Sequence, residues 1–137
     1  MAGNILTYAD ACLLIAAFKE KDARNAQALA IIKDERRSFI VSDALWLELM
    51  PAPLRNKRHN EVAFYERFFA RSQHVPMTDT IMRRARDFAG RYFLDAMDAI
   101  HIAYAMEAGA DEFVSAERIT KPMFRVLEVP MTSIALE

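Results

Sequence analysis

The segment "YFLDAMDAIHIAYAMEAGADEFVSAE", residues 92–117, contains the pattern of a helix, a turn and a strand in immediate succession. Asp95 is a suitable N-cap for a helix over residues 96–108, and Gly109 stands where helices often end in a left-handed residue. The apolar run "EFVS" at 112–115 then predicts a short buried strand. A helix that leads directly into such a strand is typical of βαβ units and indicates a parallel sheet.

The rest of the chain repeats this alternation of short apolar runs and helical patterns. The other predicted strands are "NILTYAD" (4–10), "SFIVS" (38–42), "HVPMT" (74–78) and "FRVLEV" (124–129). The other predicted helices cover 11–18, 22–36 with Asp22 as N-cap, 43–50 up to Pro51, 62–72 and 79–92. The alternation predicts one α/β domain over residues 1–137, with a mainly parallel sheet and helices on both faces.

Composition excludes several classes of protein. The chain has 137 residues, of which 53% are hydrophobic and 27% charged, and this is the composition of a globular domain rather than a disordered one. A net charge of −1 argues against nucleic-acid binding through bulk positive charge, so any such binding needs local basic clusters. Cys12 is the only cysteine, and the apolar stretch 11–18 is too short to span a bilayer. We therefore expect a soluble cytoplasmic protein.

Acidic residues from distant parts of the chain fall near the ends of predicted strands or the starts of the helices beside them. Ligands of open parallel sheets bind in the crevice beyond the carboxyl ends of the strands, so we expect these acids to meet there. They are Asp10, Glu48, Asp98 and Glu117. Clustered carboxylates repel one another unless they share a proton or a cation, and oxygen donors suit Mg²⁺ or Mn²⁺. The pattern predicts metal-assisted hydrolysis of a phosphodiester.

Each acid also has an ordinary structural explanation. Asp10 is a good N-cap for helix 11–18, and on its own that explanation is the better one. Asp98 lies in the first turn of its helix, where the helix dipole favours an acid. Glu48 fits a solvated helix stripe, and Glu117 could pair with Arg118. These explanations do not account for the position of all four acids at the predicted crevice.

Four segments, spread over nearly the whole chain, have the pattern of a known family. They are "LTYADACLLIAAF", "SDALWLELM", "LDAMDAIHIAYAMEAGADEFVSAE" and "FRVLEV". Through them the chain resembles a PIN domain, and specifically the VapC-like ribonuclease toxins of prokaryotic toxin–antitoxin pairs. The third segment carries most of the resemblance.

The resemblance implies a fold, a site and partners. The implied fold has three α/β/α layers around a parallel sheet of about five strands in the order 3-2-1-4-5. Asp10, Glu48 and Asp98 match the conventional acidic site of the family. Glu117 stands where such domains usually carry Asp, two residues after Ser115, and this departure could alter metal affinity or activity. The resemblance also implies a homodimer and inhibition by a cognate antitoxin protein.

The favoured hypothesis is an endoribonuclease in which Asp10 and Asp98 bind Mg²⁺ or Mn²⁺. Glu48 and Glu117 would then orient or deprotonate the water that attacks the RNA phosphodiester. One alternative is a catalytically weak or inactive PIN-like module that binds RNA or acts as a scaffold. A phosphatase or phosphotransfer domain ranks third, because "DACLL" offers no hydroxyl beside Asp10.

The sequence does not decide between a functional and a structural role for two further features. His101 follows Asp98 by one turn, but a histidine on a buried helix face is more often a packed, satisfied residue. Six basic residues are candidate phosphate contacts or simply parts of solvated faces: Arg55, Lys57, Arg58, Arg83, Arg84 and Arg86.

Overall fold

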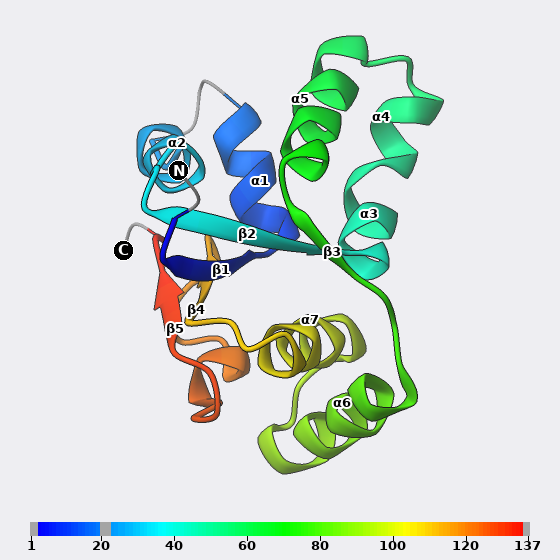
Figure 1. Cartoon of the computed structure of the whole chain (residues 1–137), viewed down its shortest axis with the longest axis vertical. Helices are drawn as coiled ribbons and strands as arrows, with labels where there is room; N and C mark the ends of the chain where they lie inside the picture. Colours follow the sequence, from blue (N-terminus) through cyan, green and yellow to red (C-terminus); the bar gives the residue numbers. More distant parts are fainter. Residues whose placement is uncertain (1–2, 20–22, 136–137) are drawn as a thin grey trace.

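Five parallel strands form the centre of the molecule in a computed structural model that describes residues 3–19 and 23–135 (Figure 1). The strands are β1 (Ile5–Ala9), β2 (Arg37–Ser42), β3 (Gln73–Val75), β4 (Glu112–Ser115) and β5 (Met131–Ser133). Their order is β3-β2-β1-β4-β5, and every neighbouring pair is parallel. This confirms the predicted order 3-2-1-4-5 and places β1 in the middle of the sheet.

Helices cover both faces of this sheet, which confirms the three-layer α/β/α architecture. In Figure 1, α1, α2 and α5 lie above the sheet with α3 and α4 beside them, and α6 and α7 lie below it. The bounds are α1 (Ala11–Phe18), α2 (Asn25–Ile32), α3 (Asp43–Leu49), α4 (Pro51–Arg55), α5 (His59–Ala70), α6 (Asp79–Tyr92), α7 (Ala96–Glu107) and the short 3₁₀ helix η1 (Pro122–Arg125).

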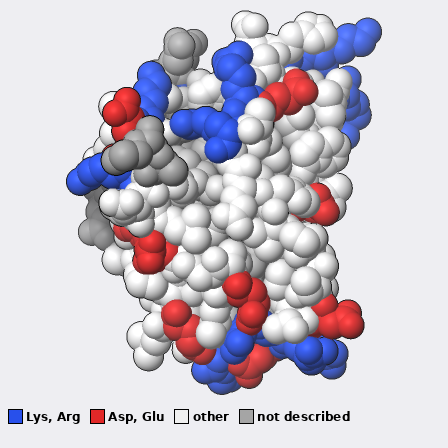
Figure 2. Space-filling view, in the orientation of Figure 1, with Lys and Arg blue, Asp and Glu red and all other residues white. Residues whose placement is uncertain are grey.

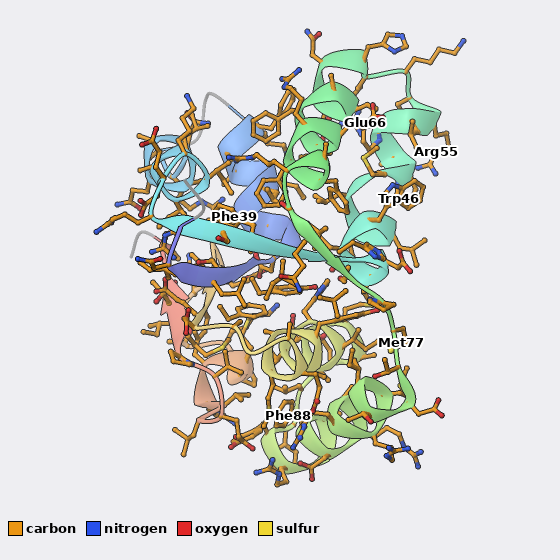
Figure 3. All side chains as sticks on the ribbon, viewed as in Figure 1. Phe39, Trp46, Arg55, Glu66, Met77 and Phe88 are labelled. Carbon is orange, nitrogen blue, oxygen red and sulfur yellow. The ribbon has the colours of Figure 1, made fainter. Side chains whose placement is uncertain are left out.

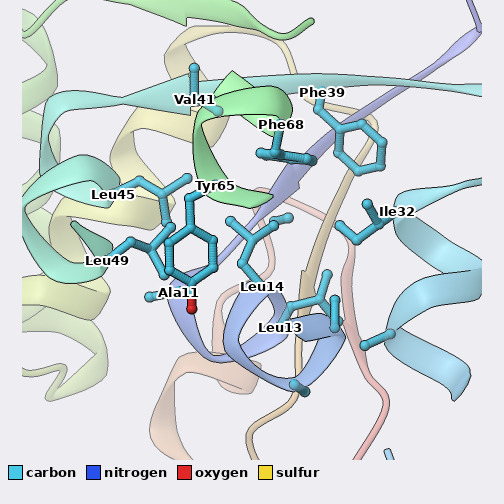
Figure 4. Close-up of a cluster of buried hydrophobic side chains, with 14 of the residues drawn as sticks. Ala11, Leu13, Leu14, Ile32, Phe39, Val41, Leu45, Leu49, Tyr65 and Phe68 are labelled. Atoms are coloured by element: carbon cyan, nitrogen blue, oxygen red, sulfur yellow. The ribbon is translucent and has the colours of Figure 1, made fainter. Parts of the chain in front are cut away.

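Successive side chains of a strand point to opposite faces of the sheet, so one hydrophobic cluster forms beneath each layer of helices. On β2, Phe39 and Val41 pack with α1, α2 and α5, whereas Ile40 between them packs with α6 and α7. Figure 4 shows the upper cluster, in which the ring of Tyr65 from α5 lies over α1. Phe88 belongs to the lower cluster and lies on α6 in Figure 3. Both faces of the sheet are therefore buried, as expected for parallel strands.

Four of the described helices begin with a side-chain N-cap. In each case an oxygen of the cap accepts a hydrogen bond from the backbone N–H three residues later. The caps are Asp10 for α1, Ser42 for α3, Thr78 for α6 and Asp95 for α7. Beyond α7, Gly109 has a φ of 72°, so the predicted left-handed position after this helix is confirmed.

The prediction of a strand at 124–129 is wrong. Residues 122–125 form η1, which Pro122 begins, and the fifth strand is Met131–Ser133. Val126 and Val129 are buried in the lower cluster while Leu127 is 87% exposed. The buried valines are thus three positions apart, and this apolar loop does not pair with the sheet.

Several helix boundaries also differ from the sequence-based expectation, among them that of the helix predicted over 62–72, which is observed as His59–Ala70. The helix predicted over 22–36 is observed as Asn25–Ile32, and its expected cap, Asp22, lies outside the described residues. Pro51 ends α3 as predicted but also occupies the first turn of α4, where a proline costs no helical hydrogen bond. None of the helices in the described part of the chain is both long and apolar enough to cross a membrane.

Candidate active site

A cavity of about 480 Å³ opens beyond the carboxyl ends of β1 and β4. Its walls come from the start of α1, from α3, from the start of α7 and from the loop after β4. All four acids singled out in the sequence line it, as do Asp95, His101 and Lys121. Topology explains this placement, because β1 and β4 are neighbours in the sheet and their carboxyl ends face the same edge.

Asp10 follows β1 and is both a helix cap and a cavity residue. Its Oδ1 accepts hydrogen bonds from the Leu13 N–H and the Cys12 thiol, each at 3.1 Å. The side chain is buried, with only 6% of the residue exposed. Burial raises the pKa of Asp10, while hydrogen bonds from Ser115, Cys12 and Leu13 oppose the rise. The cap explanation is therefore correct, and it does not exclude a role in the cavity.

Asp98 lies in the first turn of α7, two positions after the helix begins. Its backbone N–H donates to Oδ1 of the cap Asp95 at 2.9 Å, which leaves the Asp98 side chain to face the cavity. Burial raises the pKa of the Asp98 carboxyl, the charge of Lys121 opposes that rise, and the charge of Asp95 adds to it. Of the two acids at this helix start, Asp95 caps the helix and the Asp98 side chain faces the cavity.

Lys121 lies between two of the acids and was not recognised in the sequence. Its Nζ is 3.3 Å from Oδ2 of Asp98 and 3.6 Å from Oε1 of Glu117. Burial disfavours the charged amine, but the two carboxylates outweigh this and raise the pKa of Lys121. Glu117 therefore pairs with Lys121, four residues away along the loop. A single lysine in an irregular segment has no periodicity that could have indicated its position.

Glu48 reaches the cavity from α3 and contacts a buried histidine. Its Oε1 is hydrogen-bonded to Nε2 of His101, whose residue is only 2% exposed. The other ring nitrogen, Nδ1, lies 2.6 Å from the Tyr8 hydroxyl. His101 is thus packed and satisfied, as its position suggested, and it also touches one of the acids. Sequence reasoning did not connect these two residues.

Ser115 organises the end of β4. Its Oγ accepts a hydrogen bond from the Glu117 N–H at 3.0 Å and lies 3.3 Å from the Cys12 sulfur. The Ser133 hydroxyl of β5 in turn donates to the Glu117 carbonyl. These contacts fix the backbone of Glu117 at the ends of β4 and β5, although its side chain is still 40% exposed.

The donor chemistry of the cavity fits a hard divalent cation. Five carboxylates line it, and oxygen ligands are those that Mg²⁺ and Mn²⁺ prefer. As the side chains stand, no three His, Cys, Asp or Glu groups among the described residues are gathered closely enough to hold one ion. The Lys121 amine occupies the space between Asp98 and Glu117 instead. The metal role of Asp10 and Asp98 stays a prediction.

The basic residues considered as phosphate contacts do not line this cavity. Arg58 pairs with Glu61 at 3.4 Å, and Arg84 pairs with Glu107 at 2.8 Å. On the face shown in Figure 2, Lys and Arg form separate groups near the two ends of the molecule, and the lower group is mixed with Asp and Glu. Among the described residues, Lys121 is the only Lys or Arg that lines the cavity.

Comparisons with known proteins agree with the fold. The PIN domain family matches residues 7–121, and no curated protein sequence matches. Among solved structures, the VapBC2 complex of Rickettsia felis bound to promoter DNA gives a TM-score of 0.71 at 12% identity, over 93% of this chain and 97% of that one. A toxin–antitoxin complex from Klebsiella pneumoniae gives 0.68 at 20% identity, over 90% and 94%.

A third structure is Mycobacterium tuberculosis VapC20, described as a toxin that cleaves the sarcin–ricin loop. It gives a TM-score of 0.67 at 17% identity, over 90% of this chain and 98% of that one. Identities this low establish a shared fold, and the family match adds membership over most of the chain. The sheet order agrees with this fold, and the match over residues 7–121 shows that this chain belongs to the PIN domain family.

Proposed function

We propose that this protein is a metal-dependent endoribonuclease of the VapC-like toxin kind, which hydrolyses RNA phosphodiester bonds and is neutralised by a cognate antitoxin. One observation carries the proposal: Asp10, Glu48, Asp98 and Glu117 come from four separate segments and line a single cavity. An acidic cavity of this kind at the edge of a parallel sheet suits phosphoryl chemistry, where developing negative charge must be offset.

In this proposal Asp10 and Asp98 hold Mg²⁺ or Mn²⁺, directly or through water. A bound divalent ion supplies positive charge to the phosphoryl group and makes a nearby water more acidic. The Glu48 carboxylate, fixed by Nε2 of His101, accepts the proton of the attacking water. Glu117 is the fourth acid of the cavity wall. When the Lys121 side chain moves away from Asp98, its amine can bind the substrate phosphate.

Cleavage of single-stranded RNA by the purified chain tests the proposal. We expect cleavage in Mn²⁺ or Mg²⁺, loss of cleavage in EDTA and recovery when the ion is returned in excess. Asp10→Asn, purified in the same way, reports any contaminating ribonuclease. Cleavage that continues unchanged in EDTA, or equally in Asp10→Asn, would contradict the metal-dependent mechanism.

Lys121 supports the alternative of a weak or inactive module, because it pairs with Asp98, a proposed metal ligand, and with the neighbouring Glu117. We expect Lys121→Met to bind Mn²⁺ about three- to tenfold more tightly, since an intramolecular cation no longer competes for Asp98 and Glu117. The Mn²⁺-dependent rise in Tm measures this change through linkage. Lys33→Met, at an exposed lysine outside the cavity, controls for the lost charge.

The outcomes separate the two functions. Stabilisation of the unmodified protein by Mn²⁺, strengthened in Lys121→Met, agrees with a working metal site. Stabilisation that appears only in Lys121→Met favours the inactive module, and none in either protein contradicts the proposed metal site.

The partner proposals rest on likeness to complexes of toxins with antitoxins. A second cavity of about 680 Å³, lined by apolar and basic side chains of α1, α2 and α5, is a suitable surface for an amphipathic antitoxin segment. Trp46 and Leu47 on α3 are exposed at 40% and 64% and add apolar surface that a homodimer would cover. Homodimer formation and a cytoplasmic location stay predictions.

A further inference from the structure

A chain of hydrogen bonds connects the cavity to the interior of the sheet. His101 Nε2 contacts Glu48, His101 Nδ1 lies 2.6 Å from the Tyr8 hydroxyl, and that hydroxyl lies 2.8 Å from Ser42 Oγ. Tyr8 and Ser42 are fully buried, on β1 and at the end of β2. The chain therefore joins α7, the central strand and the start of α3, which carries Glu48.

The helix cap at Ser42 sets the direction of this chain. Ser42 Oγ already accepts a hydrogen bond from the Leu45 N–H at 3.1 Å, so its own hydroxyl proton is free to point to Tyr8. The Tyr8 phenol has one proton to donate, and its oxygen lies within hydrogen-bond distance of both Ser42 Oγ and His101 Nδ1. If Ser42 donates to the Tyr8 oxygen, Tyr8 donates to His101 Nδ1, and every donor in the chain has an acceptor.

The opposite direction is unfavourable. With the proton of neutral His101 on Nδ1, the bare Nε2 would face the carboxylate of Glu48, and two acceptors would be in contact without a hydrogen. An unsatisfied buried acceptor of this kind costs the desolvation of that group. The hydrogen-bond chain consequently selects the tautomer with its proton on Nε2, which points at the carboxylate.

We propose that Tyr8 and Ser42 are positioning residues that hold His101 in the Nε2–H tautomer, so that His101 fixes the carboxylate of Glu48 at the wall of the cavity. The Glu48 side chain is 36% exposed and has several rotatable bonds, so without this contact it would turn towards solvent. The effect on catalysis rests on the proposed ribonuclease function. The tautomer itself does not.

The ¹⁵N chemical shifts of the imidazole nitrogens test the tautomer without an activity assay. We expect His101 to have its proton on Nε2 in the unmodified protein and also in Glu48→Ala, where Tyr8 alone still favours that form. The double variant Glu48→Ala/Tyr8→Phe should show a substantial share of the Nδ1–H form. Phenylalanine keeps the ring stacked on Phe113, where the two ring centroids are 5.3 Å apart. The chain has three histidines, and the signals lost in His101→Asn assign the resonance.

Tyr104→Phe is the matched control, because Tyr104 is also buried but lies outside the hydrogen-bond chain. We expect it to leave the His101 tautomer unchanged. A His101 that remains wholly Nε2–H in Glu48→Ala/Tyr8→Phe would overturn the proposal, as would an Nδ1–H form in the unmodified protein.

A pair of substitutions at His101 tests the link to Glu48. The amide nitrogen of glutamine can take the place of Nε2 and donate to Glu48, whereas the shorter asparagine mimics only Nδ1. We expect His101→Asn to lower kcat by about 10- to 100-fold with little change in KM, and His101→Gln to restore most of that loss. Equal losses in both variants would show that His101 only fills space. Absence of cleavage by the unmodified protein would reject the ribonuclease proposal while the tautomer measurement still stands.

Discussion

Replacing Asp98 by Asn should lower the rate of RNA cleavage by about 100-fold or more, the usual cost of removing one group that stabilises charge in a transition state. Asp98 lines the cavity and pairs with Lys121 at 3.3 Å, so the substitution removes a charge at the proposed metal position. The helix start does not depend on this side chain, because Asp95 caps α7. We therefore expect the loss in kcat to occur without loss of Tm.

Asp79→Asn provides the matched control for this experiment. Asp79 lies in the first turn of α6, is exposed, and does not line the cavity. The same change of charge there should leave cleavage within a few-fold of the unmodified protein. Unchanged turnover in both Asp98→Asn and Asp10→Asn would remove the proposed mechanism.

Asp10→Asn should stabilise the metal-free protein at neutral pH. Asp10 is buried and its pKa is raised above the ordinary value of 3.8, so its ionisation opposes folding at pH 7. Asparagine is an equally good cap and can still accept the Leu13 N–H hydrogen bond. We expect a gain of about 1–3 kcal/mol in the free energy of unfolding at pH 7, measured by denaturant titration in EDTA.

The stability gained by Asp10→Asn should depend on pH. A carboxyl with a raised pKa in the folded state costs nothing below pH 3.8, where both states are protonated, and costs most above its folded pKa. The advantage of Asp10→Asn should therefore shrink as pH falls towards 3.8. A loss of stability that is equal at pH 7 and pH 4 would instead make the Asp10 carboxylate a structural requirement.

Asp34→Asn is expected to behave in the opposite way and serves as a control. Hydrogen bonds from the side chain and backbone of Arg36 lower the pKa of Asp34 to about 2. Ionised Asp34 thus adds stability above pH 3.8, and this contribution is lost as pH falls towards 2. Substitution by Asn should lower stability at pH 7 and have little effect in strong acid.

Much of the fold could be predicted because local signals and buried patterns agree. The helix and strand over residues 96–115 have a cap, a left-handed glycine and an apolar run in the right order, and all three occur in the structure. The fifth strand could not be placed in the same way. "VLEV" is an apolar run rich in valine, as strands often are, but its buried residues Val126 and Val129 are three positions apart and its backbone lies outside the sheet. An apolar run alone does not establish strand pairing.

The acidic residues of the site could also be found, because strand ends in a parallel sheet meet at one edge. Lys121 could not, since it belongs to a loop whose path depends on η1 and β5. Nor could the bond between Tyr8 and His101, which are 93 residues apart and look like ordinary core residues in the sequence. Which polar groups pair inside a core depends on packing at the scale of ångströms.

The sequence by itself determined the α/β class, the sheet order through family resemblance, and four acids that all line one cavity. It could do so because periodicity, capping and turn preferences are local properties of the chain. Only the tertiary structure decided how the side chains in that cavity are paired: which acid is a cap, which acids face Lys121, and which groups His101 contacts. Those outcomes depend on distances between side chains from different elements, and no local pattern encodes them.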